Sequence, residues 1–369
     1  MKNALLLLFS STLSFAADVH INITVGMSSD TLMHDGTSLR IWGFREDGSA
    51  SSPYWVPGPT IRCKEGDHLF IHFANTSGLE HTIHAHGMDV PQAVDGVPST
   101  SATVPPFGEF VYDFIVPHAG TYAYHCHVHT VLHLQMGMYG SVIVDPISGS
   151  NTVWEAGPAF DRERLWVTGE YDSYWHWLAA NGGHPTNFPF HEYNPDYFIV
   201  NGMSGTDISE DWQTVATFAS QQKMLLRLNN IGGFLPHRFR FGQLQVQTVI
   251  SDGRPLPEPM RIFSNEITVY PGERYGVLVE GPVGEYMTEI DYLSIYDESL
   301  VGSAEVPLII YLEGDSTRDG KRDILDLIQL LNGIANPSSL GHVSFLAADL
   351  DENGVIETED FLLLLPLIL

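Results

Sequence analysis

The chain has 369 residues, of which 44% are hydrophobic and 17% charged, so it can build proper cores and is neither disordered nor a coiled coil. Acids outnumber bases by 45 to 17, and a formal net charge of −28 repels phosphate backbones and anionic lipid, which argues against nucleic-acid binding. Two cysteines are too few for a disulfide scaffold. The length predicts two domains and a smaller module.

The first 17 residues, MKNALLLLFSSTLSFAA, combine one lysine, a short apolar run and small residues at the end. This composition is typical of a secretory signal peptide, here assigned to residues 1–17 with cleavage near Ser14-Phe15-Ala16. The apolar run from Ala4 to Phe9 is too short to cross a bilayer. The sequence therefore predicts a protein that is secreted or extracytoplasmic, with no membrane span.

Short segments of alternating polarity fill most of the chain. Those between Val19 and about Pro146 read HINITV, HLFIHFAN, GEFVYDFIV and GSVIVD. Those between about Arg164 and Leu312 read RLWVTGE, DYFIVNG, KMLLRLNN, LQVQTVIS, NEITVY, YGVLVEG and PLIIYLEG. This period-two pattern predicts an all-β fold of two β-sandwiches, over residues 18–148 and 149–313. The stretch from Trp175 to Pro195 is expected to be a long irregular connection.

Histidine, cysteine and methionine gather in two short runs of the first block, LEHTIHAHG at 79–87 and YHCHVHTVLHLQMGMYG at 124–140. A blue-copper site needs two imidazoles, one thiolate and a weak axial thioether. Cys126, His133 and Met138 supply three of these ligands on one strand-end loop, and His81 supplies the fourth. The two runs therefore predict a type 1 copper site.

Alternate residues on a strand point to one face, so His84 and His86 are expected to lie side by side. His125 and His127 do the same around Cys126, which faces the opposite way. One strand can thus hold a thiolate-bound copper on one side and offer two imidazoles on the other. This spacing predicts an electron route from the thiolate to a second metal site through covalent bonds.

These runs resemble the multicopper oxidase family. PGPTIRCKEGDHLFIHFANT, HTIHAHG and HCH with a downstream His and Met are similar to its copper-binding motifs, while DYFIVNG, LLRLNNIGG, VISDGRPLPEP and YPGERYGVLV are similar to its non-copper domain. The resemblance covers about residues 19–313 and is to two-domain, laccase-like members. It implies two cupredoxin-like Greek-key β-sandwiches. It also implies type 1 copper at His81, Cys126, His133 and Met138, and a type 2/type 3 cluster at His84, His86, His125 and His127.

The spacing of the type 1 ligands leaves alternatives open. Three-domain members place the histidine five residues after the cysteine, where this chain has Val131; the spacing to His133 is closer to that of two-domain members. With His129 as the ligand, no methionine follows at the usual distance. Met136 competes with Met138 as the axial ligand, and Met138 is preferred on spacing.

The histidine set is incomplete for this family. A complete trinuclear cluster takes eight histidines, and the first block supplies four. The second block offers His237 alone, in PHRFRFGQL. The histidines of the connection lack ligand spacing and are expected at the surface or in packing: His176, His184 and His191. A homotrimer would bring His237 of a neighbour to a smaller site, as in copper nitrite reductase.

Three functions therefore stay open. The first is a secreted oxidase that takes single electrons from a phenolic or metal-ion donor and reduces dioxygen. The second is a type 1 copper electron-transfer or copper-binding protein. The third is a nitrite-reductase-like enzyme with an intersubunit type 2 copper. Asp89 and Asp95 are candidate proton donors. A classical hydrolase is disfavoured because the chain has neither a G-x-S-x-G nor an HExxH motif.

Cys63 lies in a predicted strand and is expected to be a buried small hydrophobe. Pairing it with Cys126 would destroy the copper site, so both cysteines are expected to be reduced.

The tail contains a repeated acidic loop, DSTRDGKRDILD at 315–326 and DLDENGVIETED at 349–360. Both loops have oxygen side chains at positions 1, 3, 5, 9 and 12 and glycine at position 6, which suits calcium. The candidate ligands are Asp315, Thr317, Asp319, Asp323 and Asp326, then Asp349, Asp351, Asn353, Glu357 and Asp360. Apolar helical runs follow each loop, and FLLLLPLIL is expected to be a buried helix end.

The duplicated loop resembles a dockerin domain. The resemblance implies a small α-helical module over residues 314–369 that binds calcium and docks on a cohesin-type partner. A purely stabilising appendage stays open.

Overall fold

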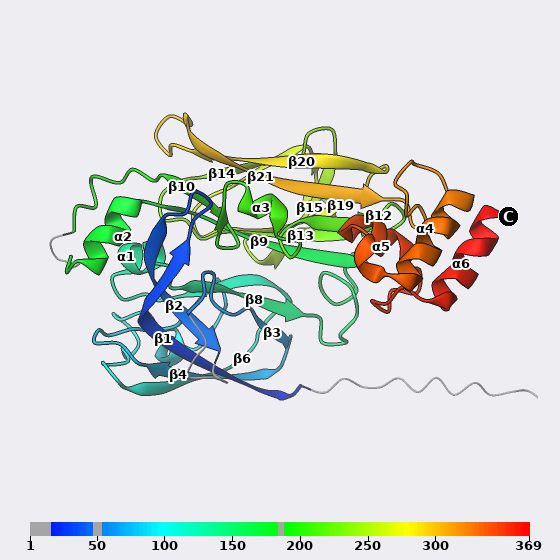
Figure 1. The fold of residues 1–369 in the computed structure, drawn as a ribbon. Coiled ribbons are helices and arrows are strands. Elements are labelled where there is room, and N and C mark those ends of the chain that lie inside the picture. The colour runs from blue at the N-terminus through cyan, green and yellow to red at the C-terminus, as the bar shows by residue number, and fades with distance from the viewer. Residues whose placement is uncertain (1–15, 47–53, 184–187) are drawn as a thin grey trace, which may run out of the picture.

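The computed structural model describes residues 16–46, 54–183 and 188–369. Most of the expected signal peptide and His184 lie outside them. Figure 1 shows two β-sandwiches, one above the other, with a helical module packed at one end of the second. In the described part of the chain, no helix is long and apolar enough to cross a membrane.

The first sandwich pairs two four-stranded sheets, with strand orders β2-β1-β4-β6 and β3-β8-β7-β5. The strands of the first sheet are β1 (Asp18–Leu32), β2 (Ser38–Glu46), β4 (His68–Asn75) and β6 (Glu109–Ile115). Those of the second are β3 (Ile61–Lys64), β5 (His84–His86), β7 (Gly120–His125) and β8 (Tyr139–Asp145). In β4 every second residue is buried, so the strand covers the core with one face only.

The second sandwich is larger. One sheet has the order β11-β10-β9-β13-β19-β15-β16, with β17 also paired to β15, and the other has the order β12-β21-β20-β14-β18. The first sheet contains β9 (Arg162–Tyr171), β10 (Tyr197–Val200), β11 (Met203–Ser204), β13 (Met224–Asn230), β15 (Val246–Ser251), β16 (Arg254–Pro255), β17 (Phe263–Ser264) and β19 (Arg274–Val279). The second contains β12 (Ala216–Ala219), β14 (His237–Arg240), β18 (Glu266–Val269), β20 (Gly284–Leu293) and β21 (Leu300–Tyr311).

The connection after β9 is more ordered than expected. It contains α2 (Ser173–Ala180), which begins where the Asp172 side chain accepts a hydrogen bond from the Trp175 amide. Trp175 is fully buried and belongs to the core cluster of the first sandwich, where it forms a T-shaped contact with the Phe188 ring at 5.1 Å. The connection therefore covers the first sandwich, because its aromatic residues bury more apolar surface there than a solvated loop would.

The C-terminal module consists of α4 (Ile324–Ala335), α5 (His342–Ala348) and α6 (Thr358–Ile368). Val343 and Ala347 of α5 pack into an apolar cluster with Tyr311 of the second sandwich, and an Arg162–Glu352 ion pair of 2.5 Å flanks the contact. FLLLLPLIL forms the end of α6, as the sequence predicts, but the expectation that this helix end is buried is wrong. Leu364 is buried, but Leu362 is 60% exposed, because a single helix on a small module buries only one stripe.

The fold is thus predominantly β, as the sequence predicts, and the expected strand HLFIHFAN is β4 residue for residue. The remaining helices are short: α1 (Thr130–Gln135), α3 (Asp207–Glu210) and the 3-10 turns η1 (Gln92–Val94), η3 (Glu258–Met260) and η4 (Pro337–Ser339).

Candidate copper centres

His81, Cys126 and His133 meet inside the first sandwich. Cys126 directly follows β7, and α1 turns His133 back toward it. The Cys126 Sγ lies 3.0 Å from His133 Nδ1 and 3.6 Å from His81 Nδ1. All three side chains are completely buried. Two imidazole nitrogens and one thiol thus converge on one point, which is the donor set of a blue-copper site.

The outer nitrogens of the two imidazoles have different surroundings. His81 Nε2 lies 2.7 Å from the Ser77 hydroxyl, which fixes the ring so that Nδ1 faces the thiol. Among the described residues, the buried His133 Nε2 has no hydrogen-bond partner, and the Trp42 ring forms a T-shaped contact with this ring at 5.4 Å. His133 is therefore shielded from solvent by Trp42 of β2 and the neighbouring core.

Met138 and Met136 are both fully buried. The Met138 amide donates to the His133 carbonyl at 2.9 Å, and its own carbonyl accepts from the Cys126 amide at 3.1 Å. The backbone therefore ties Met138 to two candidate ligands, whereas the Met136 amide caps α1. The alternative ligand His129 stays outside the group, with its ring 6.1 Å from that of His133.

Burial controls protonation at this site. It raises the pKa of the Cys126 thiol to about 11 and lowers the pKa of His81 to about 4. The imidazoles are thus neutral near pH 7, as a metal requires, and metal binding would release the thiol proton. These residues fit copper, because a soft thiolate with two imidazoles selects it and the backbone of Met138 is hydrogen-bonded to two of the three residues.

A second group forms on the neighbouring strand pair. His84 of β5 is the register partner of His125 of β7, and His86 Nδ1 lies 3.2 Å from His125 Nε2. Ligand atoms of His84, His86 and His125 all lie within 4.8 Å of one another. The ring of His127 lies 5.1 Å from that of His84. All four histidines predicted for the second copper cluster therefore gather in one place.

Three of these rings are oriented through one nitrogen. His125 Nδ1 lies 3.0 Å from the Cys126 carbonyl oxygen and His127 Nδ1 3.3 Å from the Thr130 hydroxyl. His84 Nδ1 lies 2.7 Å from the carbonyl oxygen of Asp95 and 3.1 Å from its carboxylate. Each contact leaves Nε2 available for a metal. Asp95 therefore orients His84, whereas Asp89 pairs with Arg254 at 2.6 Å.

Arg274 of β19 closes this group from the second sandwich, which the sequence did not indicate. It is 2% exposed, forms a 2.5 Å ion pair with Asp252 and donates to the Gly272 carbonyl at 2.6 Å. Its guanidinium lies so close to Gly87 that a side chain there would overlap with it. Burial, Arg274 and the neighbouring histidines lower the pKa of His86 to about 4.

The histidines outside the first block do not join the group. His237 is completely buried in the second sandwich, with Nδ1 at 2.7 Å from the Thr168 hydroxyl and Nε2 at 3.1 Å from Glu170. Both nitrogens are engaged, so the expected donation of His237 to a neighbouring chain does not fit this structure. His176 is a packing residue whose Nδ1 lies 2.7 Å from the Arg40 carbonyl oxygen, and His191 lies at the surface. Within the described residues, the group therefore contains only first-block histidines.

Cys63 lies in β3 and is 4% exposed, and burial raises the pKa of its thiol to about 12. Both cysteines are free, as expected.

The two acidic loops, 34 residues apart, share one backbone hydrogen-bond pattern. Asp315 and Asp349, at position 1, each accept hydrogen bonds from the amides at positions 5 and 6. Asp326 and Asp360, at position 12, each accept the amide at position 9. Positions 4 and 6 have positive φ in both loops. Such a loop turns its carboxylates inward.

The other candidate ligands lie around the same loops. Carboxylate oxygens of Asp349, Asp351 and Asp360 lie within 4.8 Å of one another, whereas the Thr317 hydroxyl bridges Asp315 and Asp326 in the first loop. The remaining candidates make local contacts: Asp319 to the Lys321 amide, Asp323 to the Leu325 amide, and Asn353 to Glu357.

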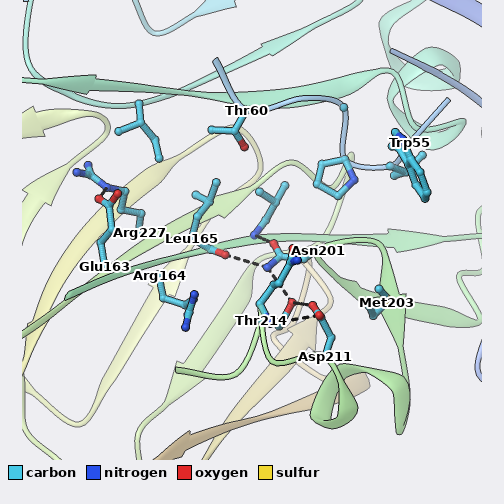
Figure 2. Close-up of a pocket in the computed structure, with 16 residues that line it drawn as sticks. Trp55, Thr60, Glu163, Arg164, Leu165, Asn201, Met203, Asp211, Thr214 and Arg227 are labelled. Carbon is cyan, nitrogen blue, oxygen red and sulfur yellow. Dashed lines mark hydrogen bonds and ion pairs between the residues drawn. The ribbon is translucent and has the colours of Figure 1, made fainter. Parts of the chain in front are cut away.

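A cavity of about 720 Å³ lies between the two sandwiches. Figure 2 shows Trp55 and Thr60 of the first sandwich on one side and Arg164 and Asn201 of the second on the other. None of its lining residues is a histidine or cysteine. The cavity is thus separate from both candidate copper centres.

Comparisons with known proteins identify the family of the chain. Two family models, both described as multicopper oxidase, match residues 54–149 and 166–299. Copper resistance protein A of Escherichia coli is 29% identical over 273 residues, covering 63% of this chain and 43% of that protein. Laccase-2 of Cryptococcus neoformans var. grubii is 26% identical over 247 residues, covering 62% of this chain and 40% of that protein. The chain thus spans less than half the length of these relatives.

Solved structures share the fold. A blue copper oxidase from Nitrosomonas europaea has a TM-score of 0.62 and 24% identity, covering 80% of this chain and 86% of that chain. A copper nitrite reductase from the same organism has a TM-score of 0.60 and 19% identity, covering 80% of this chain and 94% of that chain. The two family models together match more than half of the chain, which shows that this chain belongs to the multicopper oxidase family.

Proposed function

We propose that this protein is a secreted multicopper-oxidase-like oxidoreductase that takes single electrons from a phenolic or metal-ion donor and reduces dioxygen. The observation that carries the proposal is the position of Cys126 between His125 and His127. The cysteine belongs to the buried thiol site, and its two neighbours belong to the histidine group. A protein that only carried electrons would not need the second group.

The chain's own residues fit this role in three ways. The His125 Nδ1 contact with the Cys126 carbonyl oxygen adds a hydrogen-bonded link to the covalent one between the two sites. Copper at these sites would supply one-electron redox chemistry. Asp95, at 3.1 Å from His84 Nδ1, is an acid that could hold or move a proton beside the group. Because His133 is buried, an electron donor cannot touch its ring. This favours a donor that binds outside Trp42 and transfers its electron across that side chain.

A nitrite-reductase-like activity is the second candidate. It is favoured by the compact group of His84, His86 and His125, which is sufficient for a single copper ion. A larger cluster needs further ligands. Whether they come from this chain or from a neighbour in a homotrimer, they would have to be residues other than His237.

The test is oxygen consumption by the copper-loaded protein with a one-electron donor. Cys126→Ser should abolish both oxygen consumption and any intense blue colour, while the matched Cys63→Ser should retain both, because Cys63 is a buried thiol of the same sandwich outside the site. Oxygen consumption at the wild-type rate in Cys126→Ser would refute the proposal. Reduction of nitrite without consumption of oxygen would favour the second candidate.

We also propose that the C-terminal module is dockerin-like, binds calcium in both loops and docks on a cohesin-type partner. The equal geometry of the two loops supports the calcium sites. Exposed leucines and isoleucines on α4 and α6 support a docking face: Ile324 at 60%, Leu325 at 52%, Ile328 at 50%, Leu331 at 50% and Leu362 at 60% exposed. The packing of α5 on the second sandwich also agrees with a stabilising role.

The test for docking is binding of the calcium-loaded protein to an immobilised cohesin domain. Binding that is lost after Leu325→Asp, with the calcium affinity unchanged, is the expected result. Absence of binding to any cohesin tested, with both calcium ions bound, would favour the stabilising role.

A further inference from the structure

The outward face of the sheet β2-β1-β4-β6 contains a second set of histidines. In β4, His68, Phe70 and His72 point outward, because every second residue of this strand is buried. The parallel register places His20 of β1 opposite Phe70. Figure 1 shows β4 and the beginning of β1 on the side of the first sandwich that faces away from the second. This face is therefore separate from the two copper centres described above.

His20 and His72 point a nitrogen at each other across the two strands. His20 Nδ1 lies 3.0 Å from His72 Nε2, and the ring centroids are 5.3 Å apart. The His20 ring stacks on Phe70 at 4.6 Å with an interplanar angle of 10°. Eight residue pairs hold β1 and β4 in register. The two imidazoles are thus positioned by paired backbone and by an aromatic ring.

The separation of the two nitrogens matches two adjacent ligands of one metal ion. Metal–nitrogen bonds of about 2.05 Å that meet at a right angle place the two nitrogens about 2.9 Å apart, whereas a tetrahedral angle needs about 3.3 Å. The observed 3.0 Å is closer to the right-angled arrangement. Tetragonal geometry with nitrogen and oxygen ligands is typical of Cu²⁺ and Ni²⁺, and Cu²⁺ binds such sites most tightly.

The surroundings favour a cation. Carboxylates of Asp113 and Asp18 lie 3.4 and 3.8 Å from the ring nitrogens of His68 on the same face. The whole chain has a formal net charge of −28, which raises the local concentration of metal cations. His20 is exposed and His72 half-buried, so water can complete the coordination.

We propose that His20 and His72 form an exposed metal site that binds one Cu²⁺, with water in the remaining positions. The site is independent of the proposed oxidase function, since neither residue belongs to the buried centres.

The test is a calorimetric titration of the copper-loaded protein with Cu²⁺, with electron paramagnetic resonance on the same samples. The wild type should bind one additional equivalent and gain a tetragonal signal with nitrogen ligands. His72→Ala and His20→Ala should each weaken this binding by at least about tenfold, which is ~1.4 kcal/mol. The matched control His191→Ala removes a side chain that is 82% exposed and should leave the titration unchanged.

Two results would overturn the proposal. Absence of an additional equivalent in the wild type would show that the two imidazoles only share a hydrogen bond. Unchanged binding in His72→Ala, with loss in His20→Ala, would assign the copper to His20 with a free amino terminus at Asp18. The circular dichroism of each variant, compared with that of the wild type, checks that it is folded.

Discussion

Gly87→Ala tests the contact between the histidine group and the second sandwich. Gly87 has a φ of +83°, and a methyl group there would overlap with the guanidinium of Arg274. Gly36 is the matched control, because its φ is +85° and no atom lies within 4 Å of the position a methyl group would take. Both substitutions carry the same backbone strain, and only Gly87→Ala displaces a neighbour.

The expected loss of stability follows from the displacement of Arg274. An alanine at positive φ costs about 1 kcal/mol of stability in either position. Displacing Arg274, which is 2% exposed, also breaks its ion pair with Asp252, whose side chain is 60% exposed. Breaking a fully buried pair costs about 3–5 kcal/mol, and exposure of one partner reduces this to about 2 kcal/mol. Gly87→Ala should therefore be about 2 kcal/mol less stable than Gly36→Ala.

Urea unfolding of the metal-free proteins measures this difference. Copper analysis should also show less copper in the histidine group of Gly87→Ala, because His86 is the adjacent residue, with the type 1 absorption retained. Arg274→Ala in the Gly87→Ala background should restore part of the stability, and a double-mutant cycle measures the coupling. Equal stability and equal copper content of Gly87→Ala and Gly36→Ala would refute the reasoning.

Three further predictions concern other parts of the molecule. Burial lowers the pKa of His176 to about 4, below its unfolded value of 6.5. The stability that the neutral side chain contributes above pH 6.5 is therefore lost as the pH falls toward 4. His176→Gln should reduce the difference in stability between pH 7 and pH 4 by about 3 kcal/mol, measured by urea unfolding of metal-free protein. An equal pH dependence in His176→Gln would contradict it. Ser77→Ala removes the partner of His81 Nε2 and should weaken copper binding at the thiol site by about 10–100-fold in a competition titration. An unchanged copper affinity would show that Ser77 does not orient His81. Asp360→Ala should remove one of the two proposed calcium equivalents, because this carboxylate accepts the amides at positions 2 and 9 and so holds the loop closed. Two retained equivalents would place the calcium elsewhere.

Local patterns in the sequence were enough to predict most of the strands and the proximity of the candidate ligands in the first block. His84 and His86 lie on one three-residue strand, and Cys126 follows directly on β7, so period-two alternation and short spacing define their neighbourhood. Burial of His133 could not be predicted this way, because Trp42 comes from a strand almost one hundred residues earlier.

Contacts between the two sandwiches could not be predicted from the sequence either. Arg274 reaches the histidine group from the second sandwich, and no local pattern marks it. His237 looked available because it stands alone in its segment, whereas Glu170 of another strand engages it in the core. In both cases, partners distant in sequence decide the role of the residue.

The copper content per chain, with electron paramagnetic resonance on the same sample, tests the proposed copper chemistry most directly. The protein is loaded with copper and then dialysed against a chelator that removes surface ions. We expect one type 1 copper, lost in Cys126→Ser, and at least one further copper that Cys126→Ser retains in the histidine group. A single copper per chain, or copper-loaded protein without a type 1 signal, would contradict the two-centre arrangement.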